Sequence, residues 1–211
     1  RKYIKISFPT FSGNQAYPDL LKTFLDQYPD IEVFSVEDST DRQFELLDKE
    51  LTDLAITVRF FSDPCQRAQF DKIYNHYPLK KSRQCFCVHV NHPLAKESFV
   101  TMEQIAKENL IMLRASFNQT AGIKKRFKQL KLDIKVIHYT SQMYTIERFI
   151  EKNVAVGFLP EEVARQNPNI VPIPYEGSKM RAIEIFWRKD HYLYKAVQDF
   201  IRTAKELYPL S

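Results

Sequence analysis

The 211-residue sequence contains only four glycines, and this scarcity excludes several classes of active site. Phosphate-binding loops and dinucleotide fingerprints need clustered glycines, and neither pattern occurs. The G-x-S-x-G turn of a nucleophilic serine and the H-E-x-x-H pair of a zinc protease are also missing. The sequence therefore predicts no catalytic constellation and no cofactor.

Cysteines and long apolar runs are equally scarce. Three cysteines, an odd number, argue against a disulfide framework, and Cys85 and Cys87 share one face of an expected strand. His89 and His92 lie nearby, but Pro93 ends that strand, so four tetrahedral metal ligands are not expected. No apolar run approaches the length of a membrane span, and no signal peptide opens the chain. These absences predict a cytoplasmic protein with no metal and no membrane contact.

The composition that is present suits a packed α/β protein. Hydrophobic residues make up 44% of the chain and charged residues 27%, which is enough apolar material for a core. The net charge is +5, and the basic residues are scattered except for one cluster at 124–128. No nucleic-acid recognition motif accompanies this cluster, so it indicates a solvated helix face rather than a nucleic-acid surface.

Alternating strand and helix patterns are organised around Leu54-Ala-Ile-Thr-Val58. This short, β-branched apolar run predicts a strand that is covered on both faces. Two strand–helix pairs precede it, expected at 3–8, 18–28, 31–36 and 40–51. Thr40 and Gln43 have the spacing of a capping box at the start of the second helix. Residues 59–79, which include Tyr77-Pro78, are expected to form a long polar loop.

A second alternating set follows this loop. Its strands are expected at 84–90, 110–113, 134–139, 154–159 and 170–173. Thr101 and Gln104 repeat the capping-box spacing before a short helix. A last strand at 182–187 and an amphipathic helix over 193–208 are expected to return to the first set.

Two such sets predict two Rossmann-like α/β subdomains, each with a mostly parallel sheet. Subdomain I is expected to combine residues 1–81 with 182–211, and subdomain II to span 82–181. The two connecting segments would form a hinge that permits closure around a ligand in a cleft between the subdomains. In open α/β sheets ligands bind beyond the carboxyl ends of the strands, so the loops at those ends are the candidate site.

Four short motifs occur in order along the chain: F-x-x-x-Y-P-D-I at 24–31, D-L-A-I at 53–56, H-P-L-A at 92–95 and F-L-P at 158–160. Together they resemble the effector-binding domain of LysR-type transcriptional regulators over nearly all of the chain. The resemblance implies a periplasmic-binding-protein-like fold of type II and a small-molecule effector. It also implies that DNA is bound only through an amino-terminal winged helix-turn-helix, which these residues do not include. The chain begins with Arg rather than Met, which indicates part of a longer protein.

The resemblance also implies a homodimer made through this domain. The matching helices are expected at 18–28 and 142–152, and assembly to a tetramer is common among intact members of the family. One departure concerns the G-L-G that the family often carries before the last cleft strand. Asn153-Val154-Ala155 stands in its place, and Asn153 can still adopt the left-handed backbone that a helix end requires.

Candidate effector contacts lie where expected strands end. Thr10, Phe11 and Ser12 follow the first strand and precede a helix, whose free N–H groups attract anions. In the rest of the chain the expected contacts are Thr57, Val58, Arg59, Arg114, Ser116, Phe117, Asn118, Thr140, Ser141 and Phe158. Helix capping alone would explain Thr140 and Ser141, and core packing would explain Phe158.

Arg59 and Arg114 both follow directly on buried strands. An arginine can hold a carboxylate through two parallel hydrogen bonds. One hypothesis is that one or both arginines bind an anionic effector. The alternative is that each pairs with a neighbouring acid at the surface.

Three functions fit this pattern. The first is a sensor, in which a ligand shifts the hinge and the dimer. The second is a solute-binding receptor of a transport system, which would need an export signal. The third is an enzyme with Cys65, Cys85 or Cys87 as nucleophile, which would need a base beside the thiol. The order of the motifs favours the regulator.

Overall fold

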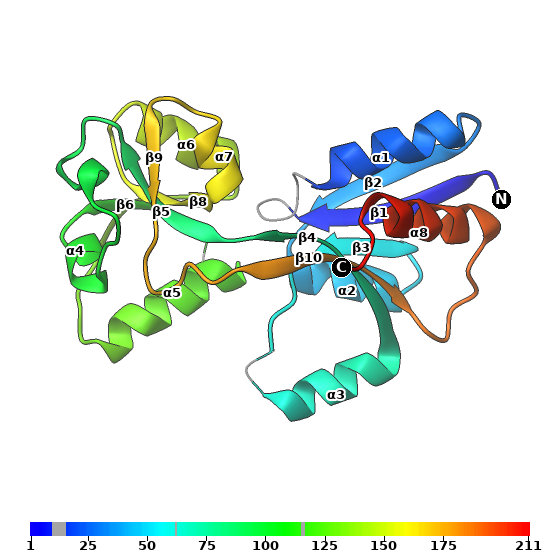
Figure 1. The fold of residues 1–211 in the computed structure, drawn as a ribbon. Coiled ribbons are helices and arrows are strands. Elements are labelled where there is room, and N and C mark those ends of the chain that lie inside the picture. Colours follow the sequence, from blue (N-terminus) through cyan, green and yellow to red (C-terminus); the bar gives the residue numbers. More distant parts are fainter. Residues whose placement is uncertain (10–15, 62, 115–116) are drawn as a thin grey trace. The chain divides into compact units, whose positions relative to one another are not determined.

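A computed structural model describes residues 1–9, 16–61, 63–114 and 117–211 (Figure 1). The chain divides into two units: unit 1 combines residues 1–82 with 181–211, and unit 2 spans 83–180. The subdomain boundaries expected from the sequence lie one residue away from these.

Unit 1 contains a five-stranded sheet in the order β2-β1-β3-β10-β4. The strands are β1 (Tyr3–Pro9), β2 (Glu32–Asp38), β3 (Leu54–Thr57), β4 (Tyr74–Ser82) and β10 (Arg181–Arg188). β1 is parallel to β2 and β3, whereas β10 is antiparallel to both β3 and β4. The expectation of a mostly parallel sheet was therefore wrong. The chain leaves unit 1 along β4 and returns along β10, so these two strands run in opposite directions.

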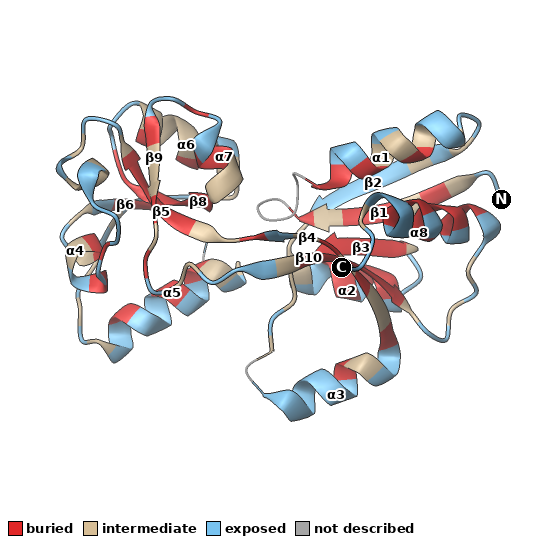
Figure 2. Ribbon diagram, viewed as in Figure 1, coloured by how far each residue is buried: buried red, intermediate tan, exposed pale blue. Residues whose placement is uncertain are grey.

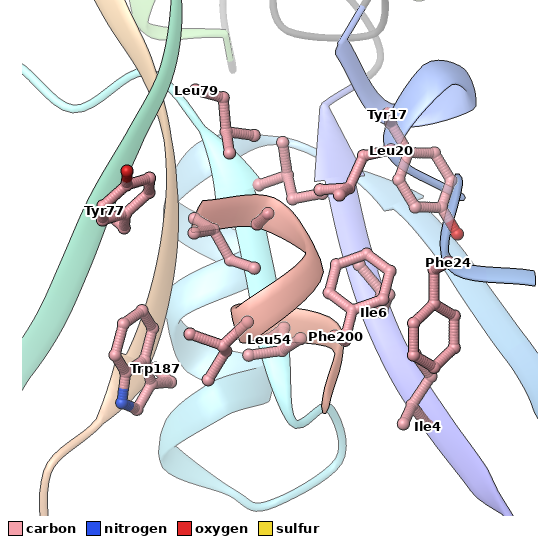
Figure 3. Close-up of a cluster of buried hydrophobic side chains, with 14 of the residues drawn as sticks. Ile4, Ile6, Tyr17, Leu20, Phe24, Leu54, Tyr77, Leu79, Trp187 and Phe200 are labelled. Atoms are coloured by element: carbon pink, nitrogen blue, oxygen red, sulfur yellow. The ribbon is translucent and has the colours of Figure 1, made fainter. Parts of the chain in front are cut away.

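Helices cover both faces of this sheet: α1 (Ala16–Gln27), α2 (Thr40–Asp48), α3 (Pro64–Ile73) and α8 (Lys195–Leu207). Successive residues of a strand point to opposite faces. Accordingly, Leu54 and Ile56 pack with α1 and α8, and Ala55 packs with α2. α1 and α8 touch through Phe24 and Phe200, whose ring centroids lie 5.0 Å apart in the cluster shown in Figure 3. β3 is therefore buried on both faces, as its sequence predicts (Figure 2).

Residues 59–79 do not form one long loop, because they contain α3 and most of β4. The Asp63 carboxylate caps α3 by accepting a hydrogen bond of 2.9 Å from the Cys65 amide, and Pro64 occupies the first turn. Phe70 is buried and holds this otherwise exposed helix against the sheet. Pro78 is tolerated in β4 because the strand lies at the sheet edge, beside a register shift in its pairing with β10.

Unit 2 is also mixed. Its strands are β5 (Gln84–His89), β6 (Asn109–Leu113), β7 (Lys135–Thr140), β8 (Gly157–Pro160) and β9 (Ile170–Ile173). β5 is antiparallel to β8 and β9, and β6 is parallel to β7. A parallel bridge between Leu110 and Val156 links the two groups of strands. β8 therefore runs in the same direction as β6 and β7.

Short helices surround these strands: η1 (Pro93–Lys96), α4 (Met102–Ala106), α5 (Asn118–Gln129), α6 (Met143–Glu151) and α7 (Glu161–Arg165). The capping box of Thr101 and Gln104 is confirmed at the start of α4. Asn153 has a φ of 55°, the left-handed conformation expected after α6. The close backbone approach falls at Gly157, where a Cβ atom would lie 3.0 Å from the carbonyl oxygen of Ile111.

Candidate functional site

Parallel strands bring their carboxyl ends to one edge in each unit, and these two edges contain most of the predicted contacts. The unit 1 edge comprises residues 37–42 and 57–59, at the ends of β2 and β3. The unit 2 edge comprises residues 83–84, 113–114, 117–120, 140–142 and 160–161. Four predicted contacts, Thr10, Phe11, Ser12 and Ser116, lie outside the described residues.

At the unit 1 edge, Thr57 joins the end of β3 to the start of α2. Its side chain is fully buried, and its hydroxyl oxygen lies 2.8 Å from that of Thr40. The capping box predicted for Thr40 does not form, because Ser39 is the N-cap residue and Gln43 donates instead to the Asp38 carbonyl at 3.2 Å. Val58 is half-buried against the core of unit 1.

Arg59 is held inside unit 1. Its Nη1 donates to Asp41 Oδ1 at 3.0 Å. The guanidinium carbon also lies 5.0, 5.5 and 5.8 Å from the ring centroids of Phe44, Phe61 and Phe70. These cation–π contacts and the ion pair fix the side chain, which is 29% exposed. Arg59 therefore pairs with a neighbouring acid, which is the second of the two alternatives that the sequence left open.

The other charged groups of the unit 1 edge are mostly acidic. Arg42 lies 2.5 Å from Glu45 and 3.9 Å from Asp38. Residues 37–42 and 57–59 include three acids (Glu37, Asp38 and Asp41) and two arginines (Arg42 and Arg59).

At the unit 2 edge, α5 begins without a side-chain cap. Phe117 is the N-cap residue and is half-buried, and Asn118 is exposed. Thr120 is buried and donates from its hydroxyl to the Leu113 carbonyl at 2.8 Å, which ties α5 to the end of β6. The Gln119 amide nitrogen is buried and has no hydrogen-bond partner within the described ranges.

Gln119 lines a small recess with room for about one water molecule. Phe158 lines the same recess but belongs mainly to the core. It is 3% exposed, and its ring centroid lies 5.8 Å from that of Phe86 and 5.1 Å from that of Tyr175. Phe158 is therefore mainly a core residue, as the second of its two predicted roles has it.

Thr140, Ser141 and Arg114 are brought together at the ends of β6 and β7. The Arg114 amide donates to the Thr140 carbonyl at 2.9 Å, and the Thr140 hydroxyl accepts from the Gln142 amide at 3.1 Å. Thr140 is buried and Ser141 is half-buried. Thr140 thus acts as a local cap just before α6, which the structure starts at Met143.

Arg114 differs from Arg59: its side chain is exposed, and within the described residues of unit 2 it forms no ion pair with an acid. The backbone around it is nevertheless fixed, because the Phe117 amide donates to the Arg114 carbonyl at 3.0 Å.

The sequence did not single out a third arginine at the unit 2 edge, Arg83. Its Nε donates to Glu161, which also accepts from Arg165 Nε at 2.9 Å. These two guanidinium groups lower the pKa of Glu161 to about 2. Only the antiparallel pairing of Gln84 with Pro160 brings Arg83 and Glu161 together, and a contact between residues so far apart leaves no local signal in the sequence.

The two buried cysteines offer no activated nucleophile. Cys85 and Cys87 are buried, and all three thiols are free. Burial, with the nearby Glu161 carboxylate, raises the pKa of Cys85 to about 11, and burial raises the pKa of Cys87 well above its usual value. A thiol with a raised pKa is not a thiolate near neutral pH, so neither residue suits nucleophilic attack.

Among the described residues, no group of three or more His, Cys, Asp or Glu side chains is arranged to hold a metal ion. In the same part of the chain, no helix is long and apolar enough to cross a membrane.

A family model described as the LysR substrate binding domain matches residues 1–209. The chain belongs to this family. It is 25% identical, over 96% of its length, to YwbI, an uncharacterized HTH-type transcriptional regulator of Bacillus subtilis (strain 168). It is 26% identical, over 95% of its length, to GltC, a transcriptional dual regulator of the same organism. This LysR substrate-binding domain spans 66% and 65% of the lengths of those two proteins.

Solved structures share its fold. The effector binding domain of QuiR in complex with shikimate has a TM-score of 0.77 at 20% identity, covering 98% of this chain and 96% of that one. The regulatory domain of Synechocystis PCC6803 CcmR in complex with 2-PG has a TM-score of 0.83 at 16% identity, covering 99% and 98%. The predicted α/β fold of the periplasmic-binding-protein-like type II class is confirmed.

Proposed function

We propose that this LysR substrate-binding domain senses a small organic anion for a transcriptional regulator of which it forms part. The observation that supports this most directly is the ligand content of its structural neighbours, since QuiR and CcmR carry shikimate and 2-PG on the same fold. The edges described above supply the matching chemistry, with arginines, hydroxyls and helix N-termini at the ends of parallel strands.

In this proposal the effector binds at loops that follow the ends of parallel strands, and binding favours one conformation of the protein. A ligand changes such an equilibrium only by as much as it prefers one state. The DNA contacts are assigned to a helix-turn-helix elsewhere in the regulator, and the protein is expected to act in the cytoplasm, to bind its effector without turnover and to need no cofactor.

A homodimer through α1 and α6 is also part of the proposal. α6 exposes 67% of Tyr144, and α1 has partly buried leucines at Leu21 and Leu25 that pack against the core of unit 1. Twofold pairing of such surfaces is the usual route to a dimer. Lys22→Glu in α1 and Tyr144→Glu in α6 are each expected to shift the protein toward monomer in sedimentation velocity. Tyr192→Glu, which changes a residue 78% exposed outside both helices, is the matched control.

The effector assignment is tested by a thermal-shift screen of this domain against small carboxylates, phosphorylated acids and amino acids. A ligand that binds only the native state adds about 2.7 kcal/mol of stability at one hundred times its Kd. A compound that raises Tm and is recovered unchanged supports the sensor. Chemical conversion of the compound would instead indicate an enzyme, and a panel that leaves Tm unchanged throughout would count against effector binding.

A further inference from the structure

The helix α5 and the turn after it hold the excess positive charge of the chain. Residues 118–131 contain five basic residues and no acid. The whole chain has 31 basic and 26 acidic residues, so the remainder, with 26 of each, has no net charge. All five basic residues are exposed on the outer surface of α5 and its turn (Figure 2): Lys124, Lys125, Arg126, Lys128 and Lys131.

Four of these side chains are available to a partner. Arg126 pairs with Glu176 at 2.9 Å, whereas the four lysines have no acid at ion-pair distance among the described residues. Lys124 donates to the Tyr139 hydroxyl at 2.8 Å, which is an uncharged partner. The buried Ile123 and Phe127 hold the opposite side of α5 against the core of unit 2. The four lysines, called the α5 lysines below, are therefore unpaired charges on a fixed helix.

The placement of the α5 lysines works against the stability of the helix. Lys124 and Lys128 lie four residues apart on one face, where two like charges repel. Lys131 has a φ of 57°, a left-handed conformation that glycine adopts more readily. The helix dipole attracts cations to the last turn, which would account for Lys128 but not for Lys124 and Lys125. The shared sign of these residues therefore indicates an anionic partner outside the domain.

We propose that the α5 lysines bind the phosphate backbone of double-stranded DNA. Arginine suits carboxylates through two parallel hydrogen bonds, whereas lysine binds phosphate as a point charge, and here every unpaired group is a lysine. Lys124 and Lys131 are about 10 Å apart along the helix axis, the length over which one DNA strand presents about three phosphates.

This inference adds a second DNA contact to the regulator of the proposed function. Base reading stays with the helix-turn-helix, since phosphate contacts carry no sequence information and need no recognition motif. The contact does not involve the effector. The thermal-shift screen therefore decides the sensor function separately, because it contains no DNA.

The test is a fluorescence anisotropy titration of two unrelated, labelled DNA duplexes with the domain, over a series of NaCl concentrations. Both duplexes are expected to bind with the same affinity. If each α5 lysine neutralises one phosphate, the logarithm of the binding constant should fall against that of the salt concentration with a slope of about −3.6. Absence of binding at low salt, or a clear preference for one duplex, would overturn the inference. Equally tight binding of poly-L-glutamate would also overturn it, in favour of an acidic protein partner.

Variants locate the contact. The double variant Lys124→Gln/Lys128→Gln should weaken binding about tenfold or more at low salt and reduce the slope by about two. Lys49→Gln, which removes an exposed charge between Asp48 and Glu50 of unit 1, should change affinity by less than about twofold. An unchanged slope in the double variant would overturn the inference.

Lys131→Gly separates binding from folding. Glycine suits the left-handed backbone at this position, so the variant is expected to keep or raise Tm while DNA binding weakens about threefold or more. Unchanged DNA affinity in this variant would exclude Lys131 from the contact and contradict the proposal that all four lysines take part.

Discussion

The two edges are built from the same elements, yet their polar groups are used differently. At the unit 1 edge, α2 opens with Thr40-Asp41, and these residues pair with Thr57 and Arg59 at the end of β3. At the unit 2 edge, α5 opens with Asn118-Gln-Thr, which brings no acid to Arg114. An arginine at the end of a buried strand is therefore not by itself a ligand contact. The first turn of the neighbouring helix decides whether it is neutralised.

Substitutions at the two edges should therefore have different effects, on stability at one and on ligand affinity at the other. A side chain with partners inside its unit contributes to the free energy of unfolding, and its loss should be visible without any ligand. A side chain without such partners contributes little to stability and can contribute to affinity. The predictions below test this separation, in order of the expected change in stability.

The largest effect is expected for Phe158→Ala in unit 2. This ring is 3% exposed and packs against Phe86 and Tyr175, so its removal leaves a cavity and should cost about 3–5 kcal/mol. Urea unfolding followed by far-UV circular dichroism measures the loss. Phe117→Ala, at a half-buried position of the same edge, is the control and should cost about 1 kcal/mol. If Phe158→Ala weakened effector binding while stability stayed unchanged, Phe158 would be a ligand contact rather than a core residue.

The next effect is expected for Arg59→Ala, at about 2 kcal/mol. The variant loses three cation–π contacts and an ion pair, and it leaves the Asp41 carboxylate without its guanidinium partner. Trp187 is the only tryptophan and lies in β10, so its fluorescence reports unfolding of unit 1. Arg114→Ala is the matched control and should stay within about 0.5 kcal/mol of the wild type. Equal losses in the two variants would remove the distinction drawn between the edges.

The sequence predicts much of this fold because its strongest signals are local. The β-branched run at 54–58 and the Thr101 capping box depend only on residues close together in the sequence. The structure contains both the strand and the capping box. Asp63-Pro64 carries the same kind of local signal, since an N-cap residue followed by proline starts α3.

What the sequence misses depends on contacts between distant segments. Thr40 does not cap its helix: Ser39 is the N-cap residue, and the Thr40 hydroxyl instead lies beside that of Thr57, 17 residues away. Arg83 and Glu161 pair across 78 residues, and the direction of β10 depends on the return of the chain from unit 2. Arg59 and Arg114 look alike in the sequence because each directly follows a buried strand. What distinguishes them is an acid in the first turn of a separate helix, Asp41 in the case of Arg59.

A pH-dependent effect is expected for Glu161→Gln. The pKa of Glu161 is lowered from 4.5 to about 2 in the folded protein, so its ion pairs stabilise the fold above about pH 4.5. This stability, about 1–2 kcal/mol after allowance for solvent, should be lost as the pH falls from 5 toward 2. The difference in Tm between wild type and Glu161→Gln should therefore shrink over that range. Glu176→Gln, which removes a more exposed partner of Arg126, is expected to show a smaller difference. Parallel profiles for wild type and Glu161→Gln would contradict the prediction.

The smallest change in stability is expected when one threonine hydroxyl is removed from either edge, at Thr57 or at Thr140. Thr57→Val should cost about 1 kcal/mol, because Thr57 is fully buried and the half-buried hydroxyl of Thr40 loses its partner. Thr140→Val should cost about 0.5 kcal/mol, since the amide that it releases belongs to exposed Gln142 and can bond to water. Both losses are measured by urea unfolding. Equal losses in Thr57→Val and Thr140→Val would contradict the prediction, because the released Thr40 hydroxyl would then cost no more than the released, exposed Gln142 amide.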